Sequence, residues 1–180
     1  MIRKKNLWLS TALMLMLGSC STNDSMTGAM SLSNVSHSDC QPRSSSRTLH
    51  DIEDRLSDIN KLFQQKLRLT YNESDETIVG EYINYQPYCD YKNVGIDIKQ
   101  DGDGTIVLNA WNDAPELVDC YCNVNIYFTI RNANRQNYHL ILNERTIDTV
   151  GDDGTKEKRT RIAYEGNISF KDQSLIIIDL

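Results

Sequence analysis

The chain has 180 residues, with 19 basic and 25 acidic side chains and a formal net charge of −6. This length is sufficient for one domain with a substantial hydrophobic core. The acidic balance argues against a nucleic-acid partner, since nucleic acids are bound through basic surfaces, and against direct adsorption to anionic lipid headgroups.

The N-terminus has the features of an export signal. Residues 3–5 are basic, and residues 7–17 form an apolar segment that matches the about 7–15 residues of a signal peptide and is shorter than the roughly 20 that span a membrane. The Leu-Gly-Ser-Cys sequence that ends at Cys20 resembles the lipobox of bacterial lipoproteins. The resemblance implies that residues 1–19 are removed as a signal peptide and that Cys20 is acylated, palmitate being a typical acyl group. The mature chain then keeps 16 basic and 25 acidic residues, a net charge of −9.

Residues 20–48 follow as the lipidated cysteine and a segment rich in serine. The apolar residues of this segment show no period, so it does not bury enough apolar surface to offset the entropy of ordering. We expect a flexible tether here and a single globular domain over residues 49–180.

The domain begins with a helical pattern. Apolar residues recur at steps of three and four: Leu49, Ile52, Leu56, Ile59, Phe63 and Leu67. This spacing predicts an amphipathic helix over about residues 49–66 that packs against a sheet. A helix that docks on a partner or a membrane surface is the alternative, and the acidic polar face disfavours a membrane.

From residue 94 the apolar period changes to two. Alternating segments occupy residues 94–98, 106–110 and 124–130, and further strands are expected at residues 138–142, 146–150, 159–164 and 175–180. Short alternating strands separated by Asn-, Gly- and Asp-rich turns predict an antiparallel β-sandwich or barrel. The last segment is apolar on both faces, so we expect a central strand or one that the helix covers.

Four cysteines remain after the lipidated one: Cys40, Cys89, Cys120 and Cys122. An even number in an exported chain predicts two structural disulfides. Cys122 is in phase with the inward residues of its strand, and Cys120 would also point inward if the strand begins there. Cys120 and Cys122 are two residues apart with parallel side chains, so they should bond to different partners, with Cys40 as the expected fourth cysteine.

The sequence contains no recognisable catalytic or metal-binding motif. It lacks the Gly-x-Ser-x-Gly, His-Glu-x-x-His and glycine-rich phosphate-binding patterns. Asp101-Gly-Asp-Gly departs from the calcium-loop template and is typical of a hairpin turn. We therefore expect no catalytic residues, no metal and no cofactor, so that the protein is not an enzyme.

Four tyrosines cluster around Cys89: Tyr82, Tyr85, Tyr88 and Tyr91. Exposed tyrosines provide rigid amphipathic area for a glycan or protein partner. The cluster is therefore a candidate aromatic binding patch, although tyrosines that complete the core would give the same pattern.

Residues 89–142, with Cys-Asp-Tyr before one strand and Asp-Cys-Tyr-Cys at the start of another, resemble the folded part of small uncharacterised lipoproteins of Bacteroidetes. The resemblance implies a β-sandwich in the cell envelope and no catalytic residues. The serine directly after the lipidated cysteine, Ser21, resembles the pattern of lipoproteins sorted to the outer membrane. The sequence does not indicate which face of that membrane the protein occupies. The predicted function is a lipid-anchored, non-catalytic envelope protein that binds a protein or glycan partner. The alternative is a small-ligand carrier or a hydrolytic enzyme with a site inside the β domain.

Overall fold

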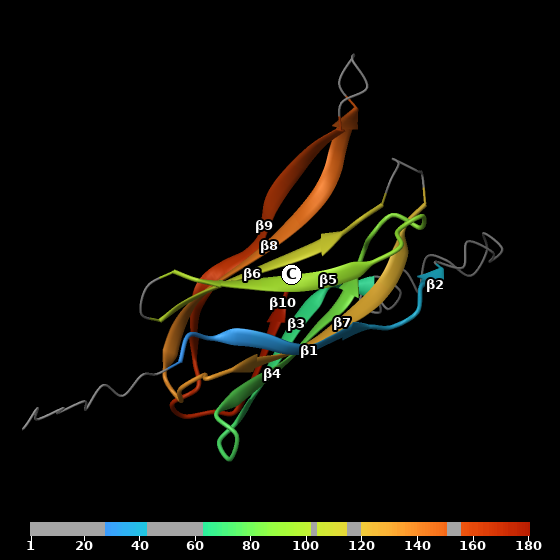
Figure 1. Cartoon of the computed structure of the whole chain (residues 1–180). Helices are drawn as coiled ribbons and strands as arrows, with labels where there is room; N and C mark the ends of the chain where they lie inside the picture. Colours follow the sequence, from blue (N-terminus) through green and yellow to red (C-terminus); the bar gives the residue numbers. More distant parts are fainter. Residues whose placement is uncertain (1–27, 43–62, 102–103, 115–119, 151–155) are drawn as a thin grey trace, which may run out of the picture.

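A computed structural model describes residues 28–42, 63–101, 104–114, 120–150 and 156–180 (Figure 1). These residues form two β-sheets. The first sheet has the order β1-β7-β4-β3-β10, and β2 also pairs with β7. The second has the order β5-β6-β8-β9. The strands are β1 (Ser31–His37), β2 (Gln41–Pro42), β3 (Lys66–Asn72), β4 (Thr77–Tyr85), β5 (Val94–Gln100), β6 (Thr105–Asn112), β7 (Cys122–Arg131), β8 (Asn137–Val150), β9 (Lys156–Ser169) and β10 (Leu175–Asp179).

The two sheets share one hydrophobic core, as in a sandwich, which agrees with the predicted fold class. Alternate residues of each strand point into this core, because successive side chains of a strand lie on opposite faces of its sheet. On the inward face of β7 the buried residues are Cys122, Val124, Ile126, Phe128 and Ile130, and in β6 they are Ile106, Leu108 and Ala110. The period-two segments therefore predicted these strands and their inward faces correctly.

A bulge in β4 changes the direction of its last side chains. The pairing of β4 with β7 shifts register between Tyr82 and Tyr85, and Asn84 within this shift has a φ of 58°. Asparagine tolerates the left-handed region better than most residues, and an extra residue in a strand reverses the alternation of its side chains. Tyr82 and Tyr85, three residues apart, therefore both point into the core, where they are 0% and 2% exposed.

The strand β1 lies where the sequence analysis predicted a flexible tether. Residues 31–37 pair with β7 in antiparallel register, from Ser31 opposite Arg131 to His37 opposite Ile126. Residues 41–42 pair with the start of the same strand. The prediction of a tether as far as residue 48 is wrong for these residues, which belong to the first sheet. Their apolar positions show no period because β1 is an edge strand with largely exposed side chains.

The predicted helix of residues 49–66 falls mostly outside the described residues. Its predicted end is wrong, because Lys66 already belongs to β3, and Leu67 is a buried residue of that strand. The hairpin of β3 and β4 was not foreseen, although both strands alternate in sequence. In the described part of the chain no helix is long and apolar enough to cross a membrane.

The strands β8 and β9 form a long hairpin that extends past the rest of its sheet (Figure 1). The structure shows one continuous strand where the sequence suggested separate strands at 138–142 and 146–150. The pairing of β6 with β8 is parallel and ends at Ala110 opposite Glu144, and beyond this point β9 is the strand that pairs with β8 among the described residues. The second sheet is therefore mixed, whereas the sequence analysis predicted purely antiparallel sheets.

The strand β10 lies at the edge of the first sheet and pairs with β3. It is not the central strand that its apolar sequence suggested. Ile176 and Ile178 face the core, whereas Leu175 and Ile177 are 47% and 57% exposed on the outward face.

Candidate functional site

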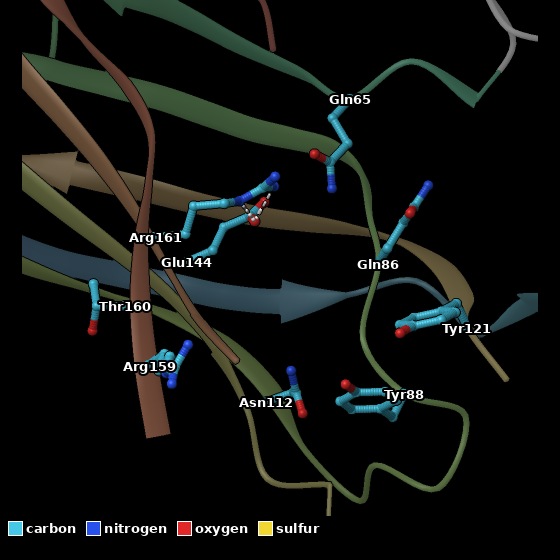
Figure 2. A pocket seen from close by; sticks show the side chains of 9 residues that line it. All are labelled: Gln65, Gln86, Tyr88, Asn112, Tyr121, Glu144, Arg159, Thr160 and Arg161. Carbon is cyan, nitrogen blue, oxygen red and sulfur yellow. Dashed lines mark hydrogen bonds and ion pairs between the residues drawn. The ribbon is translucent and has the colours of Figure 1, made fainter. Parts of the chain in front are cut away.

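The ends of strands from both sheets surround a pocket of about 590 Å³ (Figure 2). It is lined by Gln65, Gln86, Tyr88, Asn112, Tyr121, Glu144, Arg159, Thr160 and Arg161. The first sheet and its connections contribute the glutamines and tyrosines, and β6, β8 and β9 contribute the remaining residues. The volume falls within the about 300–1,000 Å³ of typical small-molecule pockets.

Glu144 forms the buried end of this pocket. It follows Leu140 and Leu142 on the inward face of β8, and it is only 3% exposed. Its Oε1 accepts a short hydrogen bond from the Tyr82 hydroxyl, and its Oε2 accepts hydrogen bonds from Nε and Nη2 of Arg161 at 3.2 and 2.5 Å. A buried carboxylate is costly unless it is paired and hydrogen-bonded, and this pair of partners provides both.

The same network shifts the pKa values of Tyr82 and Arg161. Burial, together with the charge of Glu144, raises the pKa of Tyr82 far above its usual value, so the phenol stays a neutral donor. The hydrogen bonds and charge of Glu144 raise the pKa of Arg161. Arg161 is therefore a permanent cation that reaches the pocket with a side chain that is 65% exposed.

A second buried tyrosine supports the wall formed by β6. The Tyr85 hydroxyl accepts a hydrogen bond of 3.0 Å from Nδ2 of Asn112, and its ring lies 5.4 Å from the Tyr82 ring, centroid to centroid. Burial raises the pKa of Tyr85 to about 12. The bulge at Asn84 thus places two phenols beneath the pocket, where they orient Glu144 and Asn112.

Two stacked tyrosines form the opposite side of the pocket. Tyr88 and Tyr121 lie opposite each other in an isolated antiparallel bridge, with ring centroids 5.0 Å apart and ring planes 31° apart. Tyr121 is 50% exposed. Figure 2 shows this pair across the hollow from Arg161 and Glu144, with Gln65 and Gln86 between them along one side.

A disulfide adjoins this pair directly. Cys89 and Cys120 are bonded, with Cα atoms 5.4 Å apart, and the Cys89 amide donates a hydrogen bond of 3.0 Å to the Cys120 carbonyl. Since each cysteine is next to one of the stacked tyrosines, the bond holds the two chain segments that carry the rings.

The second disulfide joins Cys40 to Cys122, with Cα atoms 5.3 Å apart. The predictions that Cys120 and Cys122 bond to different partners and that Cys122 is buried are confirmed. The condition for an inward Cys120, a strand that begins by residue 120, is not met: β7 begins at Cys122, and Cys120 is exposed just before it.

The predicted aromatic patch is wrong for half of its members. Tyr82 and Tyr85 are core residues, whereas Tyr88 and Tyr91 are partly buried. Tyr91 makes an edge contact with His37 and lies outside the pocket lining. The tyrosine pair that lines the pocket consists instead of Tyr88, which is partly buried, and Tyr121, which is exposed; the two are far apart in sequence and meet only in the fold.

Sequence reasoning missed Glu144, Arg161 and Asn112. The sequence does contain a signal for Glu144, because this residue continues the inward alternation of Tyr138, Leu140 and Leu142. A charged residue at such a buried position requires a partner. The partner Arg161 was not identifiable, because it depends on the register of β8 with β9, which places Arg161 opposite Glu144.

Metal binding finds no support in the described residues, which contain no group of three or more His, Cys, Asp or Glu side chains suited to hold a metal ion. The pocket offers aromatic faces, amides, hydroxyls, one carboxylate and two guanidinium groups. These groups suit reversible binding of a polar ligand that has an apolar face. In comparisons with protein-family models, curated proteins and solved structures, nothing matches this chain.

Proposed function

We propose that this protein is a lipid-anchored, non-catalytic component of the cell envelope that binds a saccharide in the pocket between its sheets. The lipobox at Cys20 supports an anchor, with the outer membrane as the expected location. The pocket supports a glycan rather than a protein as the partner, since a protein partner usually covers a larger and flatter area.

The observation that carries the proposal is the Tyr88–Tyr121 pair facing polar side chains across the pocket (Figure 2). A sugar ring has apolar C–H groups on its faces and hydroxyls around its edge. The exposed ring of Tyr121 suits the apolar face, because tyrosine offers rigid area at low entropic cost. Gln65, Gln86 and Asn112 supply amide donors and acceptors for hydroxyls.

The carboxylate content of the pocket supports binding without hydrolysis. Glycosidases generally place two carboxyl groups on either side of the scissile bond. Among the described residues that line this pocket, Glu144 is the one carboxylate, and Arg161 and Tyr82 already bind both of its oxygens. The alternative of a hydrolytic enzyme therefore has less support. The alternative of a carrier with an internal cavity also has less support, because the pocket lies at the ends of the sheets.

We also propose that the predicted helix of residues 49–66, shortened at its end, packs against the sandwich. Leu175 and Ile177 leave apolar surface on the outward face of β10, beside β3, which follows this segment directly. The apolar stripe of the helix would cover that surface. Circular dichroism of the intact chain would then show a helical signal that Leu56→Asp with Ile59→Asp removes.

The test uses the mature chain from residue 20 with Cys20→Ala, which retains every described residue. We expect it to bind members of an oligosaccharide array and to leave the bound sugars uncleaved. Tyr88→Ala with Tyr121→Ala should lower the signal at least tenfold, whereas Tyr127→Ala, on an outward face elsewhere, should not. An array without any bound saccharide, or cleavage that Glu144→Gln abolishes, would overturn the proposal.

A further inference from the structure

The chain enters the folded domain at the end opposite to the pocket. The Ala29 carbonyl accepts a hydrogen bond of 3.2 Å from Nδ2 of Asn132, and the Met30 amide donates one of 3.0 Å to Oε1 of Gln100. We propose that the lipid anchor therefore holds the domain with its pocket directed away from the membrane, toward a saccharide that is not a headgroup of the same leaflet. This inference rests on the proposed function, both on the anchor at Cys20 and on saccharide binding.

Both sheets place the pocket far from this entry point. β7 runs from Cys122, directly after Tyr121 of the pocket, to Arg131, which pairs with Ser31 at the start of β1. A strand rises about 3.3 Å per residue, so the two ends of this ten-residue strand are about 30 Å apart. In the second sheet Asn112 of the pocket ends β6, and the start of β6 lies at the entry end. Figure 1 shows β1 beside β7, leading away from the entry end toward β2.

The connection between the anchor and the entry point is short. Gly28, the first described residue, is eight residues after Cys20. Even a fully extended chain spans at most about 3.6 Å per residue, which gives about 29 Å here. This length does not exceed the distance from the entry point to the pocket. The pocket therefore meets the membrane only when the connection is fully extended and perpendicular to the surface.

The pairing of β1 with β7 is what shortens the connection. A tether as far as residue 48 would let either end of the domain face the membrane, whereas the paired strand fixes the chain from Ala29 onward. The net charge of −9 of the mature chain also disfavours a domain that lies flat on anionic headgroups. The accessible partner is therefore a saccharide outside the anchoring leaflet, and a glycolipid of that leaflet is out of reach.

The orientation can be measured with the tryptophan of the mature chain. This residue, Trp111, precedes Asn112 at the pocket end of β6. Energy transfer from tryptophan to dansyl-labelled headgroups reports its height above a vesicle that carries the protein lipidated at Cys20. Trp111→Phe with Arg131→Trp moves the donor to the entry end, and circular dichroism checks that the variant is folded. We expect at least threefold higher transfer from the donor at position 131.

The single variant Arg131→Trp, which retains Trp111, guards against misfolding of the double variant and should also show increased transfer. Equal transfer from the two positions would overturn the inference and leave anchoring and saccharide binding as proposed. An insertion of about 16 Gly and Ser residues after Ser21 changes the length of the connection and no described residue. It should raise the transfer from Trp111 at least twofold, and an unchanged value would contradict the role of the short connection.

A second experiment tests the source of the saccharide. An oligosaccharide selected on the array is coupled to a lipid and placed either in the vesicles that carry the lipidated protein or in separate vesicles. We expect the protein to link separate vesicles, which light scattering detects, and to keep its affinity for the soluble oligosaccharide within twofold when the glycolipid shares its vesicle. Occupation of the pocket by glycolipid of the same vesicle, without linking, would overturn the inference. A chain that does not attach to vesicles through Cys20, or that binds no saccharide on the array, would instead remove the proposed function itself.

Discussion

At the residue scale, the pocket depends on the buried contacts of Glu144. Its carboxylate lies on the inward face of β8, where a leucine would extend the core, and it is balanced by Arg161 and Tyr82. Loss of one partner would leave a buried charge uncompensated, which costs more than the pair itself contributes to stability. The same contacts that satisfy Glu144 also orient Arg161 toward the pocket.

Tyr85 should make the fold sensitive to alkali. Its pKa is raised from the usual 10.0 of a tyrosine to about 12 in the folded protein, because burial disfavours the phenolate. The stabilising effect of the neutral buried phenol is complete below pH 10 and is lost as the pH rises toward 12, because the unfolded chain releases this proton first. Urea unfolding measures the effect. Between pH 9 and pH 11, the free energy of unfolding should fall less in Tyr85→Phe than in the parent, by on the order of 1 kcal/mol.

Tyr127→Phe provides the control for this pH effect, since Tyr127 is 40% exposed. It should lose stability between pH 9 and 11 as the parent does. An identical pH dependence in Tyr85→Phe and the parent would show that Tyr85 does not titrate as described.

At the element scale, close approach of β4 and β7 requires a glycine. Gly80 lies opposite Phe128 in the strand register, and a Cβ at residue 80 would overlap the Phe128 ring. Gly80→Ala should therefore lower the free energy of unfolding by about 1–3 kcal/mol, the usual cost of overpacking a core. Chemical denaturation measures this loss.

Val79→Ala, one residue away and on the outward face where Val79 is 49% exposed, is the matched control. It should change stability by less than about 0.5 kcal/mol, as exposed substitutions usually do. A Gly80→Ala protein as stable as the Val79→Ala protein would contradict the packing described for these strands.

The two disulfides should have separable roles. Cys89→Ser with Cys120→Ser frees the segments that carry Tyr88 and Tyr121, so saccharide affinity should fall several-fold. Cys40→Ser with Cys122→Ser should instead mainly lower stability, by about 2–4 kcal/mol, since that bond closes the longer loop, with a separation of 82 residues against 31. Calorimetric binding at a temperature where both variants remain folded measures the difference, and equal affinities would contradict a positioning role for Cys89–Cys120.

The elements differ in how far sequence could predict them. The strands at 94–130 were predicted because their apolar residues alternate with other residues, and in β6 and β7 these apolar residues are buried while most of their neighbours are less so. The strand β1 was missed because its side chains are mostly exposed, so no apolar period marks it. The contact between Tyr88 and Tyr121 depends on non-local strand pairing and on the bulge at Asn84. Neither feature can be recognised in the local sequence.

At the scale of the whole molecule, the lipobox-like sequence that ends at Cys20 predicts attachment to a membrane through this cysteine. Cys20→Ala should release the protein from the membrane fraction and leave the domain folded, because every described element lies after this residue. Fractionation followed by a carbonate wash measures the release. A variant that stays with the membrane pellet after the wash would contradict lipid anchoring.

The proposed saccharide-binding site lies at the end of the sandwich, between the two sheets. The site is tested by the change in amide NMR shifts when the labelled mature chain carrying Cys20→Ala is titrated with an oligosaccharide selected on the array. We predict that the largest changes occur at Tyr88, Asn112, Tyr121 and Arg161. Changes confined to the outward face around Val79 and Tyr127, with none at the pocket, would contradict the account.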